Sequence, residues 1–254
     1  MARLLVTVAH PDDETFGTGS VIAAAAQAGV EVTVCCATRG EAGEGHGLPA
    51  GADLAAIREA ELRAAGAILG VHRVVVLGYG DSGMDGTPAE GTLTAASTAE
   101  VAERVAAVIA EVQPDVVVTL DPAGTDGHRD HTAIGQATIQ ACQALPALRV
   151  YAWTVRRSVL ARWFAELEKV RPGSAHLDLD REGLGRPDPD ITTVLDHRDL
   201  RALRARAMAA HASQTAPFDD MAADLRDEFL DTDCLVRIQP AWAGGEIEHA
   251  LFHG

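Results

Sequence analysis

The chain has 254 residues, with 37 Asp and Glu against 21 Lys and Arg, and a formal net charge of −16. This acidic balance disfavours binding to a nucleic-acid backbone, because phosphate contacts need clustered cations. Hydrophobic residues make up 47% of the chain and charged residues 23%, so the apolar surface is large enough to form a core and a disordered acidic tail is excluded. We therefore expect a globular protein with an acidic surface.

The start of the chain and its cysteines indicate the compartment. The first ten residues, MARLLVTVAH, hold a shorter apolar run than the ~7–15 residues of a signal-peptide core, and no segment reaches the ~20 apolar residues of a membrane span. The four cysteines form no C-x-x-C pair, which argues against a disulfide framework or a zinc ribbon. Such thiols are typical of a reducing compartment, so we predict a cytoplasmic protein with no membrane partner.

Short β-branched runs alternate with Ala-rich segments over the first 155 residues, which is typical of βαβ units around a parallel sheet. The strands are predicted at Leu4–Val8, Val30–Cys36, Arg73–Leu77, Asp115–Leu120 and Arg149–Val155. The helices between them are predicted at Ser20–Ala28, Ala52–Leu69, Ala96–Val112 and Thr132–Leu145. Gly29 and Gly70 follow two of these helices, where glycine commonly ends a helix. The predicted fold class is α/β, with a Rossmann-like, doubly wound and mostly parallel sheet.

The rest of the chain is less regular. Residues 171–190 hold three of the eleven prolines and are predicted to form a loop or an excursion from the sheet. They are followed by a predicted strand at Ile191–Leu195, a basic helix at His197–Ala212 and a last strand at Cys234–Ile238. We interpret the chain as a single domain, 1–254, with a core at 1–155 and a C-terminal elaboration at 156–254. The oligomeric state is left open, a homo-oligomer included.

Polar side chains follow the first and the fourth predicted strands. His10, Asp12 and Asp13 come after the first strand, and His128 and His131 come after the fourth. In an open α/β sheet the carboxyl ends of parallel strands form the ligand-binding edge, so these side chains are expected to meet. His10, Asp13 and a histidine of the fourth loop would supply two imidazoles and a carboxylate to a divalent metal, as in catalytic zinc sites. The same donors also describe a non-haem Fe²⁺ site.

Several segments of the chain carry a resemblance to a known family. AHPDDE at 9–14 and GHRDH at 127–131 each follow a predicted strand. The other segments are TRGEAG at 38–43, Arg58 before Glu61 and Leu62, LGYGDSGM at 77–84 and AAHASQ at 209–214. In this order they resemble the PIG-L (LmbE-like) family of zinc-dependent deacetylases. Members of that family remove acetyl groups from N-acetylglucosamine units in mycothiol and bacillithiol synthesis and in glycolipid anchor assembly.

The resemblance implies roles for the residues of the two histidine loops. His10, Asp13 and His131 would bind one Zn²⁺ ion per chain, with Fe²⁺ as the alternative metal. Asp12 would be the general base that takes a proton from water. His128 would be the general acid or would stabilise the oxyanion.

The resemblance also implies roles for residues around these loops. Asp130 would lie against His128 and hold it protonated, because a nearby carboxylate raises the pKa of an imidazole. Arg58 and Asp81 match positions that contact the substrate in the sugar-thiol members. Arg39 is a weaker candidate for the same role.

Two positions depart from the family pattern. Arg129 stands where many members have proline, which adds a cation at the rim of the site. Asp126 stands two residues before His128, where the mycothiol deacetylases carry a tyrosine that assists the oxyanion. An ionised aspartate cannot donate a hydrogen bond, which weakens an assignment to the mycothiol pathway. Asp126 is predicted to contact substrate.

The sequence thus predicts a zinc-dependent hydrolase that removes the N-acetyl group from an N-acetylglucosamine-type sugar or conjugate, a small-molecule substrate. Three alternatives stay open: an amidase of a sugar-thiol conjugate, an Fe²⁺ oxygenase, and a non-catalytic module that binds metal or sugar. A dinucleotide-binding protein is disfavoured, because Ile22 stands where the third glycine of G-x-G-x-x-G would be. Residues 156–190 and the C-terminal third carry no motif that identifies the aglycone of the substrate.

Overall fold

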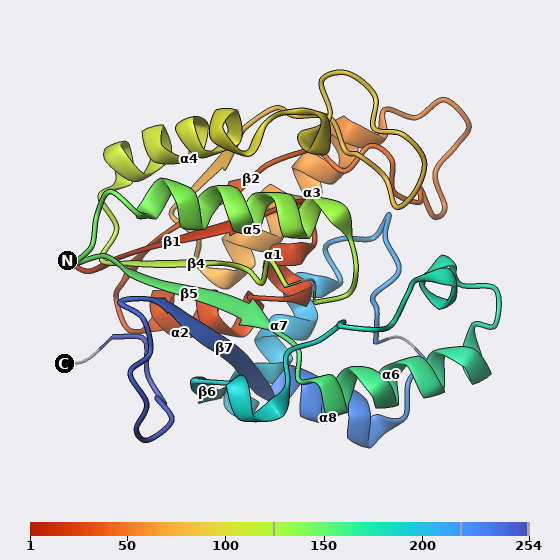
Figure 1. Ribbon diagram of the computed structural model, residues 1–254. Helices are drawn as coiled ribbons and strands as arrows, with labels where there is room; N and C mark the ends of the chain where they lie inside the picture. Colours follow the sequence, from red (N-terminus) through yellow and green to blue (C-terminus); the bar gives the residue numbers. More distant parts are fainter. Residues whose placement is uncertain (124, 219, 253–254) are drawn as a thin grey trace.

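A computed structural model describes residues 1–123, 125–218 and 220–252, and it contains a seven-stranded sheet in the order β3-β2-β1-β4-β5-β7-β6 (Figure 1). The strands are β1 (Arg3–Val8), β2 (Glu31–Cys36), β3 (Arg73–Val76), β4 (Val116–Leu120), β5 (Arg149–Thr154), β6 (Thr193–Asp196) and β7 (Thr232–Gln239). The α-helices are α1 (Asp13–Phe16), α2 (Gly19–Gln27), α3 (Leu54–Leu69), α4 (Thr98–Val112), α5 (Arg129–Cys142), α6 (Arg157–Val170), α7 (Arg201–Met208) and α8 (Ala223–Asp231).

Strands β1 to β5 run parallel to one another, which confirms the predicted mostly parallel α/β sheet. Helices α4 and α5 pack together on one face, and α2, α3 and α7 pack together on the other (Figure 1). Because both faces are covered, the central strands are buried on both sides and consist of continuous apolar runs, such as VVVTL in β4. Gly70 ends α3 in the left-handed conformation, with φ 86°, as its position in the sequence predicts.

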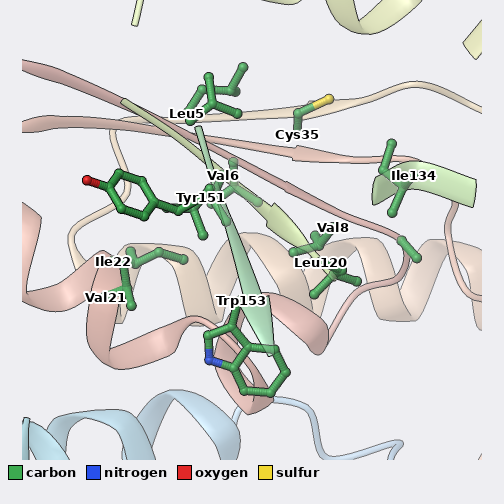
Figure 2. Packing of buried hydrophobic residues seen from close by; sticks show 14 of the residues in the cluster. Leu5, Val6, Val8, Val21, Ile22, Cys35, Leu120, Ile134, Tyr151 and Trp153 are labelled. Atoms are coloured by element: carbon green, nitrogen blue, oxygen red, sulfur yellow. The ribbon is translucent and has the colours of Figure 1, made fainter. Parts of the chain in front are cut away.

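The core is built on the alternation of side chains along these strands. Figure 2 shows Leu5 of β1 above the sheet in that view, on the same side as Ile134 of α5. Tyr151 of β5 lies below the sheet, on the same side as Ile22 of α2. All four side chains are completely buried. Burial of an aliphatic side chain of this size contributes roughly 1.5–3 kcal/mol to stability. The edge of the sheet where the strands end is therefore held on a rigid base.

The C-terminal half of the sheet is antiparallel. β7 runs antiparallel to both β5 and β6, so the predicted strands at 191–195 and 234–238 are confirmed with shifted ends. The basic helix is shorter than predicted, because a 3-10 turn at Arg198–Leu200 precedes α7 and the helix ends at Met208. Helices α6 and α8 and the short α1 were not predicted from the sequence. One sheet runs through both 1–155 and 156–254, and the single-domain assignment stays a prediction.

Two further features bear on the predicted location. The cysteines Cys35, Cys36, Cys142 and Cys234 are buried and free. Over the described ranges of the chain, none of the helices combines the length and the apolar character that crossing a membrane requires. The cytoplasmic location stays a prediction.

Candidate metal centre

Two loops meet at the carboxyl ends of adjacent strands. β1 is followed by His10 and by α1, which begins at Asp13, and β4 is followed by a loop that ends at His128, the N-cap of α5. β1 and β4 are parallel neighbours, so their carboxyl ends lie at the same edge of the sheet. The imidazole rings of His10, His128 and His131 lie 4.5 to 5.4 Å apart, centroid to centroid. The predicted meeting of the two loops is confirmed.

Asp13 lies between two of these imidazoles. Its Oδ1 is 3.1 Å from Nε2 of His131, and its Oδ2 is 3.5 Å from Nδ1 of His10. The far nitrogens of the two rings face carboxylates, with Nε2 of His10 3.1 Å from Asp130 and Nδ1 of His131 2.9 Å from Asp126. Metal-binding histidines almost always donate their second N–H to such a group, which fixes the tautomer of the ring. The arrangement therefore directs Nδ1 of His10 and Nε2 of His131 toward Asp13.

Burial and the neighbouring charges shift the pKa values of His10, Asp13 and His131 in opposite directions. Burial alone would lower the pKa of His131, but the Asp126 and Asp13 carboxylates raise it to about 10. Burial would also lower the pKa of His10, and Asp13 and Asp130 raise it well above its ordinary value. Burial alone would raise the pKa of Asp13, but the two imidazoles hold it well below its usual range. The carboxylates thus stabilise a positive charge on both imidazoles.

The donor set fits a divalent cation. Among the described residues, the carboxylates of Asp13, Asp81, Asp126 and Asp130 form ion pairs with two imidazoles, and each imidazole can carry a single positive charge. Within the described part of the chain, Oδ1 of Asp130 is buried and has no hydrogen-bond partner. Burying such an excess of negative charge is costly unless a cation balances it. Imidazole nitrogens and carboxylate oxygens are also the ligands that zinc takes in proteins.

Two further groups of potential ligands share His10. His10, His128 and His131 offer three nitrogens that all lie within 4.8 Å of one another. His10, Asp81 and Asp130 offer one nitrogen and two oxygens within the same distance. The set of two imidazoles and Asp13 therefore has competitors, and its assignment as the ligand set stays a prediction.

Asp12 has an unusual backbone conformation, with φ 114° and ψ −33°. Its N–H donates to Oε2 of Glu14 at 2.8 Å, and its Oδ2 accepts a hydrogen bond from Nη2 of Arg58 at 2.9 Å. Burial raises the pKa of Asp12 to about 7, because it outweighs the opposite effect of Arg58. The predicted general base is thus held at both its backbone and its side chain.

Arg58, predicted to contact substrate, binds protein groups in this structure, and its contact with substrate stays a prediction. Its residue surface is only 3% exposed, and its guanidinium donates to the carbonyl oxygens of Pro11 at 2.6 Å and Gly40 at 2.5 Å, as well as to Asp12. Gly40, with φ 68°, and Gly43 lie directly against the guanidinium, where a Cβ atom on either would clash with it. In this structure Arg58 therefore positions Asp12 and the loop after β2.

His128 and Asp130 lie next to each other at the start of α5. The N–H of Asp130 donates to Nδ1 of His128 at 3.2 Å, while the Asp130 carboxylate accepts from the N–H of Ser82 at 2.9 Å and faces His10. Burial, together with the charges of His10 and His131, lowers the pKa of His128 to about 3. The Asp130 carboxylate contacts His10 and Ser82 and meets His128 only through its backbone N–H, so the role of Asp130 toward His128 stays a prediction. Since Nδ1 accepts a hydrogen bond, neutral His128 carries its proton on Nε2.

Two acidic residues predicted to contact substrate contact the histidines in this structure. The side chain of Asp81 is only 4% exposed, and its Oδ1 lies 3.6 Å from Nε2 of His10. Burial would raise the pKa of Asp81, but the nearby His10 imidazole lowers it. Oδ1 of Asp126 lies 2.9 Å from Nδ1 of His131, as described above. Oδ1 of Asp126 is thus hydrogen-bonded to the imidazole, and the predicted contact of Asp126 with substrate stays a prediction.

Two arginines at the rim are also paired with protein groups. Arg39 is half exposed, and its Nε lies 2.9 Å from Oε2 of Glu59 on α3. Arg129, expected as an additional cation at the rim, instead binds the loop 82–86 that follows β3. Its guanidinium donates to the backbone carbonyls of Ser82, Gly83, Asp85 and Gly86. The cation that replaces the family proline thus ties this loop to the start of α5.

Two residues near the cluster, Glu14 and His211, were not among the predicted site residues. Oε1 of Glu14 lies 2.6 Å from Nε2 of His211, and both side chains are completely buried. Burial would lower the pKa of His211, but the Glu14 carboxylate raises it. His211 belongs to the AAHASQ segment, so the family motif was the one signal in the sequence that could have identified it.

The sequence comparisons agree with this geometry. A family model described as "PIG-L: GlcNAc-PI de-N-acetylase" matches residues 5–142. A relative from Rhodococcus erythropolis is 39% identical over 238 residues, covering 84% of this chain and 81% of the relative. A relative from Streptomyces griseus is 36% identical over 292 residues, covering 99% and 88%. Both relatives are named 1D-myo-inositol 2-acetamido-2-deoxy-alpha-D-glucopyranoside deacetylase.

Proteins with this fold whose structures are solved include enzymes that catalyse different reactions. N,N'-diacetylchitobiose deacetylase from Pyrococcus horikoshii has a TM-score of 0.61 and 24% identity, covering 94% of this chain and 86% of its own. A 4-carboxy-2-hydroxymuconate hydratase from Pseudomonas putida has a TM-score of 0.62 and 20% identity, covering 96% and 99%. The fold alone therefore does not decide the reaction. The family match and the relatives above 30% identity do: the chain belongs to the PIG-L family and is a deacetylase, a hydrolase of carbon–nitrogen bonds other than peptide bonds.

Proposed function

We propose that the protein is a zinc-dependent deacetylase that converts an N-acetylglucosamine glycoside and water into the free amine and acetate. The observation that carries this proposal is the placement of Asp13 between Nδ1 of His10 and Nε2 of His131, with Asp12 and His128 beside them. The relatives at 36% and 39% identity are named for a myo-inositol glycoside of this sugar. A glycoside of that class is therefore the proposed substrate.

His10, Asp13 and His131 are the proposed zinc ligands. When bound, Zn²⁺ supplies Lewis-acid chemistry, because it acidifies water and polarises an amide carbonyl. Asp130 and Asp126 orient the two imidazoles through their far nitrogens. Each of these carboxylates faces the ring nitrogen that is turned away from Asp13.

Asp12 is the proposed general base. Arg58 holds its Oδ2 at 2.9 Å, and among the described residues no hydrogen bond forms to its Oδ1. Oδ1 is thus the atom that takes a proton from the attacking water. As the carbon–nitrogen bond breaks, the same carboxyl group can return this proton to the leaving nitrogen, which completes the amine.

His128 is the proposed donor to the carbonyl oxygen. Its Nδ1 accepts a hydrogen bond from the Asp130 N–H, so its proton lies on Nε2. A donor held in place before the reaction stabilises the negative charge that develops on the oxygen when water adds. Of the two roles predicted for His128, the geometry favours oxyanion stabilisation.

The alternatives weighed from the sequence receive less support. The matching family and the relatives at 36% and 39% identity are deacetylases, which favours hydrolysis over an Fe²⁺ oxygenase or a non-catalytic binding module. For an amidase of a sugar-thiol conjugate, we see no observation in its favour. The oligomeric state stays open.

Acetate release tests this proposal directly. The enzyme would be assayed with the myo-inositol glycoside of N-acetylglucosamine, with N,N'-diacetylchitobiose and with free N-acetylglucosamine, under air and under nitrogen. We expect release from the inositol glycoside in both atmospheres, loss of release after chelation, and recovery when zinc is added. Release from none of the three would contradict deacetylation of this sugar class. Release only from the other two would retain deacetylation and contradict the inositol aglycone.

A further inference from the structure

Asp12 occupies a region of backbone space that L-amino acids rarely adopt, with φ 114°. Such a conformation costs free energy and persists only where surrounding contacts hold it. On the carbonyl side, the N–H of Thr15 donates to the Asp12 oxygen at 2.8 Å as α1 begins. On the side-chain side, Arg58 binds Oδ2. The third point of attachment is the Asp12 N–H.

Glu14 supplies the partner of that N–H. Its Oε2 accepts the Asp12 N–H at 2.8 Å, and its Oε1 lies 2.6 Å from Nε2 of His211. A completely buried carboxylate needs a charged or strongly donating partner, because an unpaired charge in the interior is strongly destabilising. His211 meets this need from a position 197 residues away in the sequence.

The segment that carries His211 is itself fixed to the body of the protein. The N–H and Oγ of Ser213 donate to the carboxylate of Glu61 on α3, at 2.9 and 2.7 Å. Nε2 of Gln214 donates to the carbonyl oxygen of Glu44 at 2.6 Å. His211 follows directly after α7, which packs on α3. The imidazole therefore presents Nε2 to Glu14 from a rigid support.

We propose that Glu14 and His211 are positioning residues that hold Asp12 in its strained conformation, so that its carboxylate stays beside the ligand cluster. Neither residue is assigned a contact with substrate, and both act through Asp12. This inference rests on the proposed function, in which Asp12 is the general base. It gives the C-terminal third of the chain a role in the reaction, although that part supplies none of the predicted ligands.

Kinetics of five variants test the inference. His211→Ala should lower kcat on the order of 10²-fold while KM and zinc affinity stay within about twofold, because a misplaced catalytic group affects the chemical step. His211→Gln should recover most of this loss, since its side-chain amide can donate to Glu14. His72→Ala, at an exposed histidine, is the matched control and should behave like wild type. Combining His211→Ala with Asp12→Ala should give no loss beyond that of Asp12→Ala alone.

Hydrogen–deuterium exchange of the segment 9–16 gives a readout that does not depend on substrate. We expect faster exchange there in His211→Ala than in wild type and His72→Ala. If His211→Ala does not fold, Glu14→Gln carries the test, because its side chain has one acceptor oxygen in place of two. Unchanged exchange, or losses that add in the double variant, would overturn the inference. If wild type releases no acetate, the proposed function fails, and the exchange result alone decides the role of the pair.

Discussion

The parallel and the antiparallel halves of the sheet contribute to the site in different ways. In the parallel half, the predicted metal ligands and Asp12 lie in the segments that follow β1 and β4, in the loops and at the starts of α1 and α5 (Figure 1). In the C-terminal half, β6 and β7 carry none of the predicted ligands, but the neighbouring α7 packs against α1, α2 and α3. This helix supplies Arg204, and His211 follows it. The parallel half thus provides the reactive groups, and the C-terminal half fixes their conformation.

Arg204 of α7 fixes the C-terminal end of α1. It is completely buried, and its guanidinium donates to the carbonyl oxygens of Thr15 at 3.0 Å and Gly17 at 2.9 Å. The same guanidinium lies 3.6 Å from Oδ1 of Asp233 on β7. One buried cation therefore connects the helix that begins at Asp13 with the antiparallel half of the sheet.

The largest effect is expected in the parallel half, for Asp13→Ala. Removing a proposed ligand should abolish stoichiometric zinc binding and acetate release, a greater loss than the ~10–100-fold typical for residues behind the ligands. Metal analysis after dialysis and an acetate assay measure this. Asp199→Ala, which removes an exposed carboxylate, is the control and should keep one zinc ion per chain. Full zinc binding by Asp13→Ala would exclude Asp13 from the ligand set.

The next effect is expected in the C-terminal half, for Arg204→Met. This change removes the donor to the buried carbonyls at the end of α1, while Asp233 keeps its contacts with His197 and Trp153, so the free energy of unfolding should fall by about 2–3 kcal/mol. Urea denaturation followed by circular dichroism measures the loss. A change below about 1 kcal/mol would mean that the two halves are not coupled through this residue.

Asp126→Ala should weaken zinc binding by roughly 10–100-fold, because it removes the carboxylate behind His131. Asp126→Asn should lose less, since the amide oxygen can still accept the Nδ1 proton. Competition with a chelator of known affinity measures both. Equal zinc affinity in wild type and Asp126→Ala would show that Asp126 does not support the zinc ligand His131, and would favour its predicted contact with substrate.

The smallest effect is expected for Arg129→Ala, at the boundary between the site and the loop 82–86. Loss of its hydrogen bonds to four backbone carbonyls should lower the free energy of unfolding by roughly 1–2 kcal/mol and speed hydrogen exchange in that loop. Exchange at the wild-type rate would show that the loop is held by other contacts, such as the bond from the Ser82 N–H to Asp130.

The parallel half was predictable because its signals are local. Apolar runs bounded by turn residues located β1 to β5, and ligands bind at the carboxyl ends of such strands, which placed His10 and His131 at one edge of the sheet from the sequence alone. The motifs AHPDDE and GHRDH contain the predicted ligand residues. These features depend on a few neighbouring residues, so the sequence contains them directly.

The partners of the charged side chains were not predictable in the same way. Whether Arg58 faces substrate or Asp12, and whether Asp130 faces His128 or His10, depends on tertiary packing that no local pattern encodes. The contact between Glu14 and His211 was not predictable either, because the two residues are 197 positions apart in the sequence. The sequence thus predicted which residues gather at the site, and the structure was needed to show which of them support the others.

The central claim is that His10, Asp13 and His131 hold the metal while His128 stays free to donate a hydrogen bond. Anomalous diffraction at the zinc edge, from crystals grown with zinc, tests it most directly. We predict one ion within about 2.0–2.2 Å of Nδ1 of His10, Nε2 of His131 and an oxygen of Asp13, with His128 unbound. An ion held by the three imidazoles without Asp13, or one that does not contact His131, would contradict the claim.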